Sequence, residues 1–251
     1  KFIKQFSGGA EFVRGIKKYC LWINDKDVKQ AYKISQIADR IDNVEIHRLN
    51  SKREATQTLA EYPHLFGEIR HQSSDSIIIP ATSSEKRDYI PIGFLDKETI
   101  ISNSAMAIYQ AQPWLFAVVT SRMHMVWVRN VGGKLKTDYR YSAKLCYNTF
   151  PFPNISDKQK ENLSLYVFAI IDERAKHNKT MAQLYNTATM PKGLLKAHQE
   201  LDTAIEQCYR LQPFKNDTER LEYLFKQYEE ITKKNTLFEK QKKTRKKKAK
   251  K

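Results

Sequence analysis

The chain has 251 residues, with 44 Lys and Arg against 28 Asp and Glu, which gives a formal net charge of +16. Because 41% of the residues are hydrophobic and 29% charged, the chain has enough apolar side chains for a sizeable core, which excludes disorder throughout. No apolar run approaches the ~18 residues of a membrane span, and no secretory leader opens the chain. We therefore expect a cytoplasmic protein that does not bind a membrane.

The cysteines and the first residue exclude further classes of protein. The three cysteines (Cys20, Cys146 and Cys208) are far apart and lack CxxC spacing, which argues against a disulfide framework and a structural zinc site. The chain begins at Lys1 without a methionine, and we interpret it as a fragment of a longer protein.

The positive charge is concentrated at one end. Residues 240–251 contain nine Lys or Arg and no acid, which leaves +7 for residues 1–239. Such a run has nothing to bury, so residues 239–251 are predicted to be a disordered basic tail. Two interpretations have equal weight: an arm that binds nucleic acid by counterion release, or a solubilising run with weak, nonspecific affinity.

The first third of the chain predicts helices and then short strands. Residues 26–49 are predicted to form a helix, because Ile34, Ile37, Ile41 and Val44 recur at helical spacing. A capping box formed by Ser51 and Glu54 is one possible start of a second helix. Residues 76–80, 88–95 and 99–102 then form β-rich runs bounded by Pro, Gly, Asp and Asn. A proline at position 91 indicates an edge strand or a bulge in the second run.

The sequence from residue 112 onward predicts a buried helix followed by a helical domain. Residues 112–129 are apolar on nearly every side and predict one buried helix, which starts near Pro113 and stops at the glycines 132–133. Residues 148–153 interrupt regular structure. Three helices are predicted beyond them, begun by Ser156 with Gln159, by Pro191, and by Asn216 with Glu219. The fold class is therefore α+β. Residues 1–153 form a mixed domain with a small, mostly antiparallel sheet and a buried helix, and residues 154–238 form a small α-helical domain.

No catalytic or metal-binding constellation emerges from the motifs. The sequence lacks a P-loop, G-x-G-x-x-G, G-x-S-x-G and H-E-x-x-H, and its six histidines have no ligand spacing. His198 is interpreted as a satisfied core or interface histidine and His124 as a structural one. Acids on the predicted helices are interpreted as solvated faces or intrahelical ion pairs: Asp172, Glu173, Glu200 and Asp202.

Residues 120–153 are the most distinctive segment. In it, polar residues occupy alternate positions: Lys134, Lys136, Asp138, Arg140 and Ser142. In an extended chain they would share one face. That face offers donors to guanine edges or phosphates and a carboxylate that accepts from a cytosine amino group. A solvated face of a β-hairpin is an equally weighted alternative.

The same segment resembles a known family. Residues 132–142, Gly-Gly-Lys-Leu-Lys-Thr-Asp-Tyr-Arg-Tyr-Ser, run into Tyr-Asn-Thr-Phe-Pro at 147–151. Together they closely resemble the target-recognition region of MmeI-like enzymes. These are adenine-specific DNA methyltransferases, often fused to a restriction nuclease, with stand-alone YeeA-like relatives. Further resemblances follow in the same order over nearly the whole chain, at residues 19–23, 83–94, 121–125, 184–185, 190–191, 197–202 and 219–225.

The resemblance implies roles for particular residues. The family assigns base readout to a Lys-x-Asp pair, which corresponds here to Lys136 and Asp138. That pair suits a G·C base pair, because lysine donates to guanine O6 and N7 while aspartate accepts from cytosine N4. On chemical grounds, further candidates for contacts with DNA are Arg87, Arg122, Lys134, Arg140 and Tyr141. A structural role is an equal alternative for each of these five.

One departure from the family bears on mechanism. Its methyl transfer uses an Asn/Asp-Pro-Pro-Tyr motif, whereas this sequence contains no Pro-Pro pair and no glycine-rich cofactor strand. The resemblance therefore implies that a catalytic domain with S-adenosylmethionine lies upstream in the same polypeptide, and that the target adenine is flipped out there. This chain would supply recognition of duplex DNA. The alternatives are a nonspecific nucleic-acid-binding module, a scaffold for an acidic protein partner and, least favoured, a complete enzyme.

Overall fold

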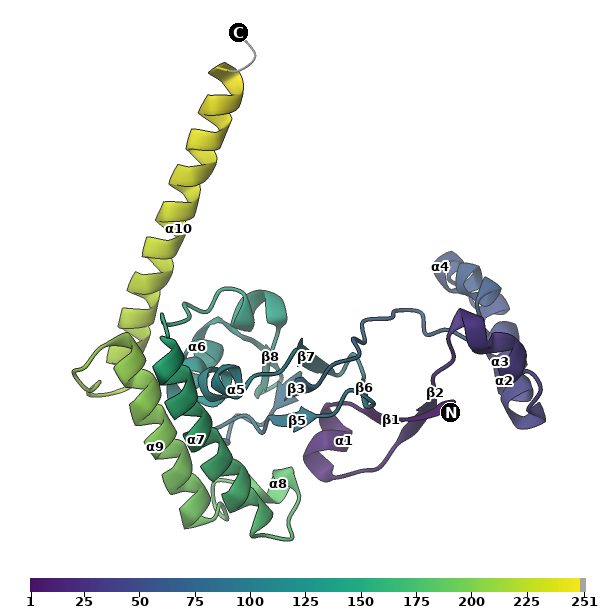
Figure 1. Cartoon of the computed structure of the whole chain (residues 1–251), viewed down its shortest axis with the longest axis horizontal. Coiled ribbons are helices and arrows are strands. Elements are labelled where there is room, and N and C mark those ends of the chain that lie inside the picture. Colours follow the sequence, from purple (N-terminus) through teal and green to yellow (C-terminus); the bar gives the residue numbers. More distant parts are fainter. Residues whose placement is uncertain (249–251) are drawn as a thin grey trace.

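The computed structural model describes the chain through residue 248, and its side chains through residue 233. The molecule is elongated, with a small helical lobe at one end and a larger body at the other (Figure 1). The strands β1 (Ile3–Ser7) and β2 (Tyr19–Leu21) lie between the two parts. None of the described helices is both long and apolar enough to cross a membrane.

The lobe has a hydrophobic core of its own. It contains a short 3-10 turn (Asp25–Asp27), α2 (Val28–Ala31), α3 (Ser35–Leu49), α4 (Glu54–Thr58) and a second 3-10 turn (Leu59–Glu61). The core residues are Phe2, Ile23, Ala31, Ile37 and Ile41. The Arg48 guanidinium donates to the backbone carbonyls of Leu59, Tyr62 and Leu65, which connects α3 to the segment that follows α4.

Two local predictions for this lobe are wrong. The helix expected over 26–49 is interrupted between α2 and α3. The capping box of Ser51 and Glu54 does not form, because α4 begins at Glu54 with Arg53 as its N-cap. The Ser51 hydroxyl instead accepts from the backbone N–H of Arg53 at 3.2 Å, which is a local turn that competes with helix capping.

The body is built on three small sheets. The central one places β3 (Ser76–Pro80) between β5 (Gly93–Leu95) and β7 (Ala105–Tyr109), all antiparallel. In the second, β1 pairs antiparallel with β2 and parallel with β6 (Ile100–Ile101). In the third, β9 (Asp138–Arg140) lies between β4 (Thr82–Ser83) and β8 (Gly133–Leu135). Five of these six pairings are therefore antiparallel, as the predicted sheet requires.

The central strand β3 is buried along its whole length. It lies beneath α1 (Gly9–Arg14), and Ile77 and Ile79 belong to the main core. The strand predicted over 88–95 is shorter than expected, since only residues 93–95 pair. Pro91 has no backbone N–H to donate to a neighbouring strand, which accounts for the missing part.

The apolar run after residue 112 forms two helices, where the sequence predicted one. They are α5 (Pro113–Thr120) and α6 (Arg122–Val131), and they meet at Ser121, whose backbone is extended. The Ser121 hydroxyl accepts from the backbone N–H of His124 and thereby caps α6. The predicted positions of Pro113 at the start and Gly132 at the stop are confirmed.

Helices gather at the end of the body that lies away from the small helical lobe (Figure 1). After a π-helical turn (Ala143–Tyr147) come α7 (Asp157–Ala175), α8 (Met181–Leu184), α9 (Lys192–Tyr209) and α10 (Asp217–Lys248). The predicted capping box of Ser156 and Gln159 is present. In the predicted cap at Asn216, the side-chain oxygen accepts from the N–H of Glu219.

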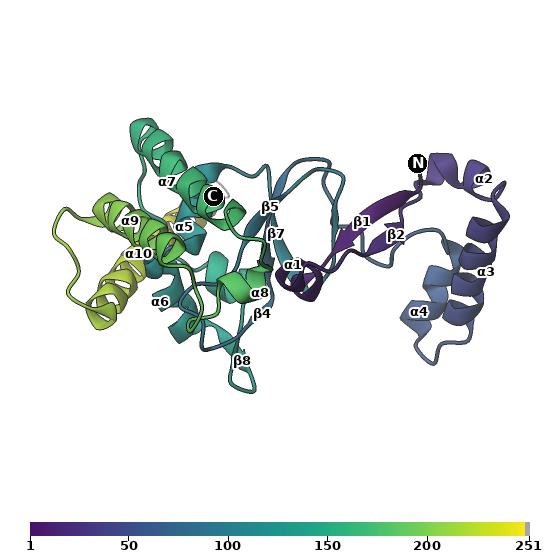
Figure 2. The same cartoon turned by 90° about the horizontal axis from the view of Figure 1, so that it is seen from below.

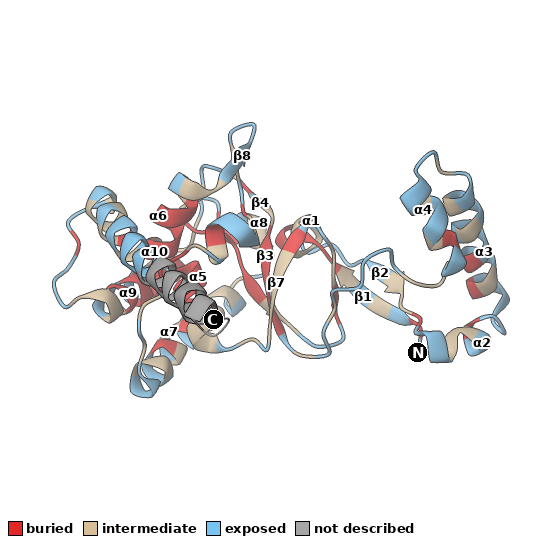
Figure 3. Cartoon of the chain, turned by 90° about the horizontal axis from the view of Figure 1, so that it is seen from above, coloured by how far each residue is buried: buried red, intermediate tan, exposed pale blue. Residues whose placement is uncertain are grey.

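The main hydrophobic core extends across the predicted domain boundary. It runs from Ile77 to Leu224, and α5 packs directly on α7 across the break at residues 153–154. Figure 3 shows these buried faces meeting inside the body. The helices after residue 154 thus pack against the same hydrophobic core as the sheets.

The basic tail also differs from its prediction. The backbone of α10 is helical through Lys248, although disorder was expected over 239–251. Lysine and arginine are good helix formers, so a basic run can continue a helix that is anchored upstream. Residues 249–251 lie outside the described part of the chain.

Replacing the capping serine between α5 and α6 should destabilise the protein. Ser121→Ala removes the hydroxyl that caps α6, and we expect the free energy of unfolding to fall by about 1–2 kcal/mol. Thr203→Ala, on the exposed face of α9, is the matched control and should change it by less than about 0.5 kcal/mol. Urea unfolding followed by circular dichroism measures both. Equal effects for the two variants would show that the cap contributes nothing.

Candidate nucleic-acid interface

The segment singled out by the sequence folds into a β-hairpin. In β8 and β9, Gly133 pairs with Arg140, Lys134 with Tyr139, and Leu135 with Asp138. Lys136 and Thr137 form the two-residue loop. Lys136 has a φ of 57°, in the left-handed region that such tight hairpin turns require. The hairpin projects from the body and its tip is exposed (Figures 2 and 3).

The common polar face expected for this segment does not form. Because the chain reverses at Lys136, alternate positions no longer stay on one side. Asp138 and Arg140 share a face of β9, whereas Lys134 lies opposite Tyr139 on the other face. The Lys134 ammonium lies 5.9 Å from the centre of the Tyr139 ring. Ser142 follows β9 and precedes the π-helical turn.

Three cations of the hairpin face the solvent. Lys134, Lys136 and Arg140 are exposed, while Asp138 is half-buried between them. The next strand, β4, adds exposed Thr82 directly opposite Arg140. The hairpin therefore presents three positive charges and one partly shielded carboxylate over a small area.

Arg87 lies beneath this surface. It is half-buried in the loop after β4, and its guanidinium donates to the Ser83 hydroxyl at 3.4 Å. Burial lowers the pKa of Arg87, and the nearby Asp138 carboxylate acts in the opposite direction. The pairing of β4 with β9 thus places the loop that contains Arg87 near the hairpin, although the two segments are far apart in the sequence.

Arg122, the first residue of α6, lies in an ion-pair network. Its guanidinium donates to both carboxylate oxygens of Asp217, at 3.0 and 2.6 Å, and its backbone N–H donates to Asp202 at 2.6 Å. Asp88 is 3.8 Å away. These contacts tie α6 to α9 and α10, so the geometry gives Arg122 a structural role, and we do not propose it as a DNA contact.

Tyr141 is part of the core. It is 3% exposed, and its hydroxyl is hydrogen-bonded to His124 Nε2 at 3.0 Å. Complete burial lowers the pKa of His124 to about 3, so the ring is neutral near pH 7. His198 is also fully buried and pairs with the Tyr185 hydroxyl at 2.7 Å. Both histidines are buried in the core, as interpreted, but His198 is not fully satisfied, because the buried Nδ1 of each ring has no hydrogen-bond partner among the described residues. Tyr141 likewise has a packing role.

Asp202 is buried, contrary to the prediction from the sequence. It was interpreted as part of a solvated face or of an intrahelical ion pair, but it is 9% exposed and accepts hydrogen bonds from the Tyr89 hydroxyl and the Arg122 backbone. Burial raises its pKa to about 6. Its spacing is the signal that was overlooked, because Asp202 lies one helical turn after the core residue His198.

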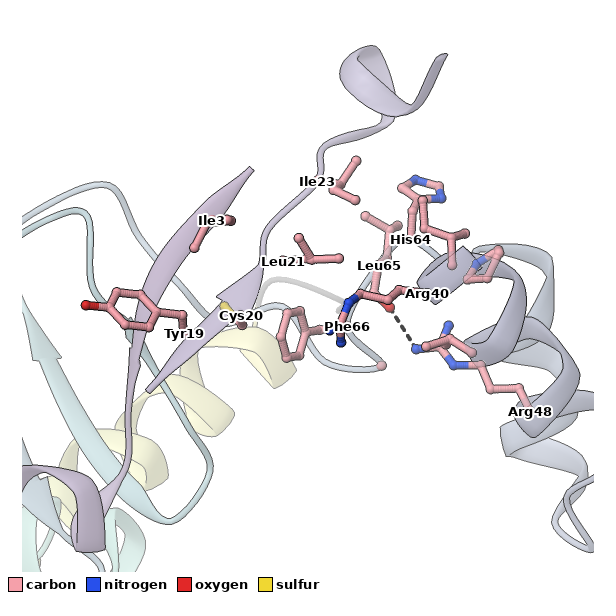
Figure 4. Close-up of a pocket in the computed structure, with 14 residues that line it drawn as sticks. Ile3, Tyr19, Cys20, Leu21, Ile23, Arg40, Arg48, His64, Leu65 and Phe66 are labelled. Carbon is pink, nitrogen blue, oxygen red and sulfur yellow. Dashed lines mark hydrogen bonds between the residues drawn. The ribbon is translucent and has the colours of Figure 1, made fainter. Parts of the chain in front are cut away.

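One cavity lies far from the hairpin. It measures about 540 Å³ and lies between β1–β2 and α3 in the lobe (Figure 4). Its walls are mostly apolar, and Arg48 beside it is held by the Leu65 carbonyl, the contact dashed in Figure 4. None of the seven candidate contact residues lines it. Through residue 233, no cluster of three or more His, Cys, Asp or Glu is arranged to hold a metal ion.

These features define a recognition module: a mixed α+β unit that presents a basic hairpin, backed by helices. Residues 1–154 match the family described as "MmeI, target recognition domain", and residues 155–236 match "MmeI, C-terminal domain". The chain therefore belongs to the MmeI-like family, and the resemblance seen in its motifs is confirmed.

Two longer relatives place the chain within that family. DNA methyltransferase A of Bacillus subtilis (strain 168) is 43% identical over 231 residues, which cover 92% of this chain and 26% of that protein. A solved structure of the type IIL restriction-modification enzyme MmeI in complex with DNA is similar with a TM-score of 0.88 and 39% identity. That match covers 92% of this chain and 31% of the MmeI chain, and it confirms the α+β fold class.

The buried Asp202 should make stability depend on pH. Its folded pKa of about 6 is above the unfolded value of 3.8. The stabilisation it provides is therefore present below about pH 4 and is lost as the pH rises through about 6. Asp202→Asn should remove this decline, a change of about 3 kcal/mol between pH 4 and pH 7. Urea unfolding across that range measures it, with Asp172→Asn on the exposed face of α7 as the control. Parallel pH profiles for wild type and D202N would contradict the assignment.

The hairpin turn should tolerate glycine better than lysine. Lys136 has a left-handed backbone, which costs a residue with a Cβ about 1 kcal/mol. Lys136→Gly should therefore raise the free energy of unfolding by up to about 1 kcal/mol. Lys134→Gly makes the same change within β8 and should lower it by about 0.5–1 kcal/mol. Thermal unfolding of both variants is the measurement, and a loss of stability in K136G would show that the turn is not strained.

Proposed function

We propose that this chain is the DNA sequence-recognition part of a site-specific N6-adenine DNA methyltransferase of the restriction-modification type. It binds duplex DNA and positions the target adenine for a catalytic domain elsewhere in a longer polypeptide. The observation that carries the proposal is the exposed basic hairpin within a fold that has a TM-score of 0.88 to an enzyme in complex with DNA.

The shape and charge of the hairpin support this role. A two-stranded ribbon fits the major groove of B-form DNA, where each base pair has a distinct pattern of donors and acceptors. Lys134 and Arg140 are exposed on its two faces and are suited to phosphates, which orient a protein on DNA without reading its sequence. Lys136 is at the tip, where it would enter the groove first.

Within this proposal, Lys136 and Asp138 read one G·C base pair. They flank Thr137 at the hairpin turn, so both side chains start from the part of the ribbon that projects furthest. Lysine donates to O6 and N7 of guanine, and aspartate accepts from the amino group of cytosine. A cation and an anion together discriminate better than two cations, because a phosphate repels the carboxylate whereas a cytosine amino group does not.

The chemistry belongs to the rest of the proposed polypeptide. The chain covers 26% of its methyltransferase relative, so most of such a protein lies outside it. We propose that the remainder contains the methyltransferase domain with S-adenosylmethionine, and that the adenine is flipped from the duplex into that domain. The present chain would supply recognition of the DNA sequence.

Exchanging the charges of the reading pair should change one position of the recognised sequence. In the double variant K136E/D138R, the acceptor and the donor trade places, so the G·C preference at one base pair should invert while the other positions keep theirs. Selection of bound duplexes from a randomised library, followed by sequencing, measures this. K158E/E161R makes an equivalent exchange on the exposed first turns of α7 and should leave every position unchanged.

The other outcomes separate the alternatives. An equal loss of binding to every sequence in K136E/D138R would assign both residues to phosphates or to the scaffold. Equal wild-type affinity for all duplexes, with a steep salt dependence, would identify a nonspecific nucleic-acid-binding module. No binding even at low salt would favour a scaffold for an acidic protein partner.

A further inference from the structure

We propose that the apolar groove of the small helical lobe is the docking site for the methyltransferase domain of the same polypeptide, and that the bound segment of that domain is apolar with one carboxylate. This inference rests on the proposed function, in which a catalytic domain lies elsewhere in a longer polypeptide. It gives the chain two contact surfaces: the hairpin for DNA and the lobe for the catalytic domain.

The groove lies between the β1–β2 ribbon and α3 (Figure 4). It measures about 540 Å³, and large apolar side chains on its walls are open to solvent. Ile3 is 68% exposed, Tyr19 59%, and Val44 and Phe66 37% each. Exposure of neighbouring apolar side chains to water is unfavourable, and a contiguous surface of this kind marks an interaction site.

The lobe differs in composition from the hairpin. Residues 22–70 contain eight Lys or Arg and eight Asp or Glu, so this part is neutral, whereas residues 133–140 contain three cations and one acid. More than half of the large apolar side chains that are exposed through residue 233 lie within residues 1–70. A neutral, apolar surface has no net attraction for phosphates. It is therefore suited to a protein partner.

One cation on the groove wall specifies the partner further. Arg40 of α3 lines the groove together with Phe66 (Figure 4). Whereas Arg48 donates to three backbone carbonyls, Arg40 has no hydrogen bond or ion pair within the part of the chain described with side chains. A segment with apolar side chains over Ile3 and Val44 and a carboxylate at Arg40 would match both features, and the surrounding apolar contact would shield the ion pair from water.

The methyltransferase domain is the occupant that we infer, because it would be tethered. This chain covers 26% of the DNA methyltransferase A of Bacillus subtilis, so most of such a polypeptide lies outside it. One wall of the groove is β1, which begins at Ile3, so a domain joined to the first residue would lie beside the groove. A short tether gives an effective concentration on the order of millimolar, at which a small contact is sufficient. Docking would also fix the distance between catalytic domain and hairpin, which a flexible linker does not.

The first test uses Cys20, which lines the groove, as a natural probe. Cys208 of α9 is also half-buried but does not line the groove, so it is the matched control. Alkylation by iodoacetamide, followed by mass spectrometry of the peptides, is measured in the 251-residue chain and in the full-length polypeptide. With a docked state populated to about 90%, Cys20 should react about tenfold more slowly in the full-length polypeptide. Cys208 should react equally in both.

Two results would overturn the inference. One is equal alkylation of Cys20 in the two proteins. The other is protection of Cys20 in the 251-residue chain alone that increases with concentration, which would show that a second copy of the chain occupies the groove.

The second test compares Val44→Glu with Ile46→Glu in the full-length polypeptide. Val44 lines the groove, whereas Ile46 is 56% exposed on the same helix and does not. V44E should return the alkylation rate of Cys20 to that of the 251-residue chain and slow methylation of the target adenine, and I46E should do neither. Unchanged protection of Cys20 in V44E would overturn the inference. Thermal unfolding shows whether V44E is folded; if it is not, Arg40→Gln takes its place and should weaken protection in the same direction.

Failure of the proposed function gives a different result. Neither substitution touches the hairpin, so V44E and I46E in the 251-residue chain should select the same duplexes as wild type. A wild-type chain without any sequence preference would overturn the proposed function, whatever the alkylation of Cys20 shows.

Discussion

The burial of α5 and α6 is the constraint on which the rest of the structure depends. These helices separate the sheets from α7, α9 and α10, and Trp127 of α6 is 1% exposed among Phe150, Phe225 and Tyr228. The hairpin begins directly after α6 ends, so the packing of α6 fixes where the hairpin projects. A recognition loop that must place a few atoms against a base edge gains its accuracy from this rigid support.

Charged residues in this protein have different functions that depend on what lies beside them. Arg122 faces Asp217 and Asp88, which makes it part of the contact between the two halves of the body. Arg140 and Lys136 face solvent on the hairpin and remain free to meet a polyanion. Arg87 lies between these cases, because it is half-buried and its guanidinium donates to the Ser83 hydroxyl. Net charge alone does not distinguish these three environments.

The helical unit and the sheets share one hydrophobic core, although two different family models match them. Their shared core is reinforced at its edge by Asp202, Arg122 and Asp217, which connect α9, α6 and α10. A buried carboxylate such as Asp202 is costly unless its acceptors are satisfied, and here both oxygens receive hydrogen bonds. The network therefore specifies how the helices sit against α6, and through Arg129 it extends to the loop beneath the hairpin.

The sequence by itself determined the family, the α+β class, most helix starts and the segment that forms the hairpin, because these depend on local patterns of apolar residues, caps and motifs. The tertiary structure alone decided the break at Ser121, the burial of Asp202 and Tyr141, and the reversal at Lys136. Each of these depends on which segments distant in sequence lie together. An alternation such as Lys134 to Ser142 specifies one face only while the chain stays extended, and a two-residue turn removes that condition.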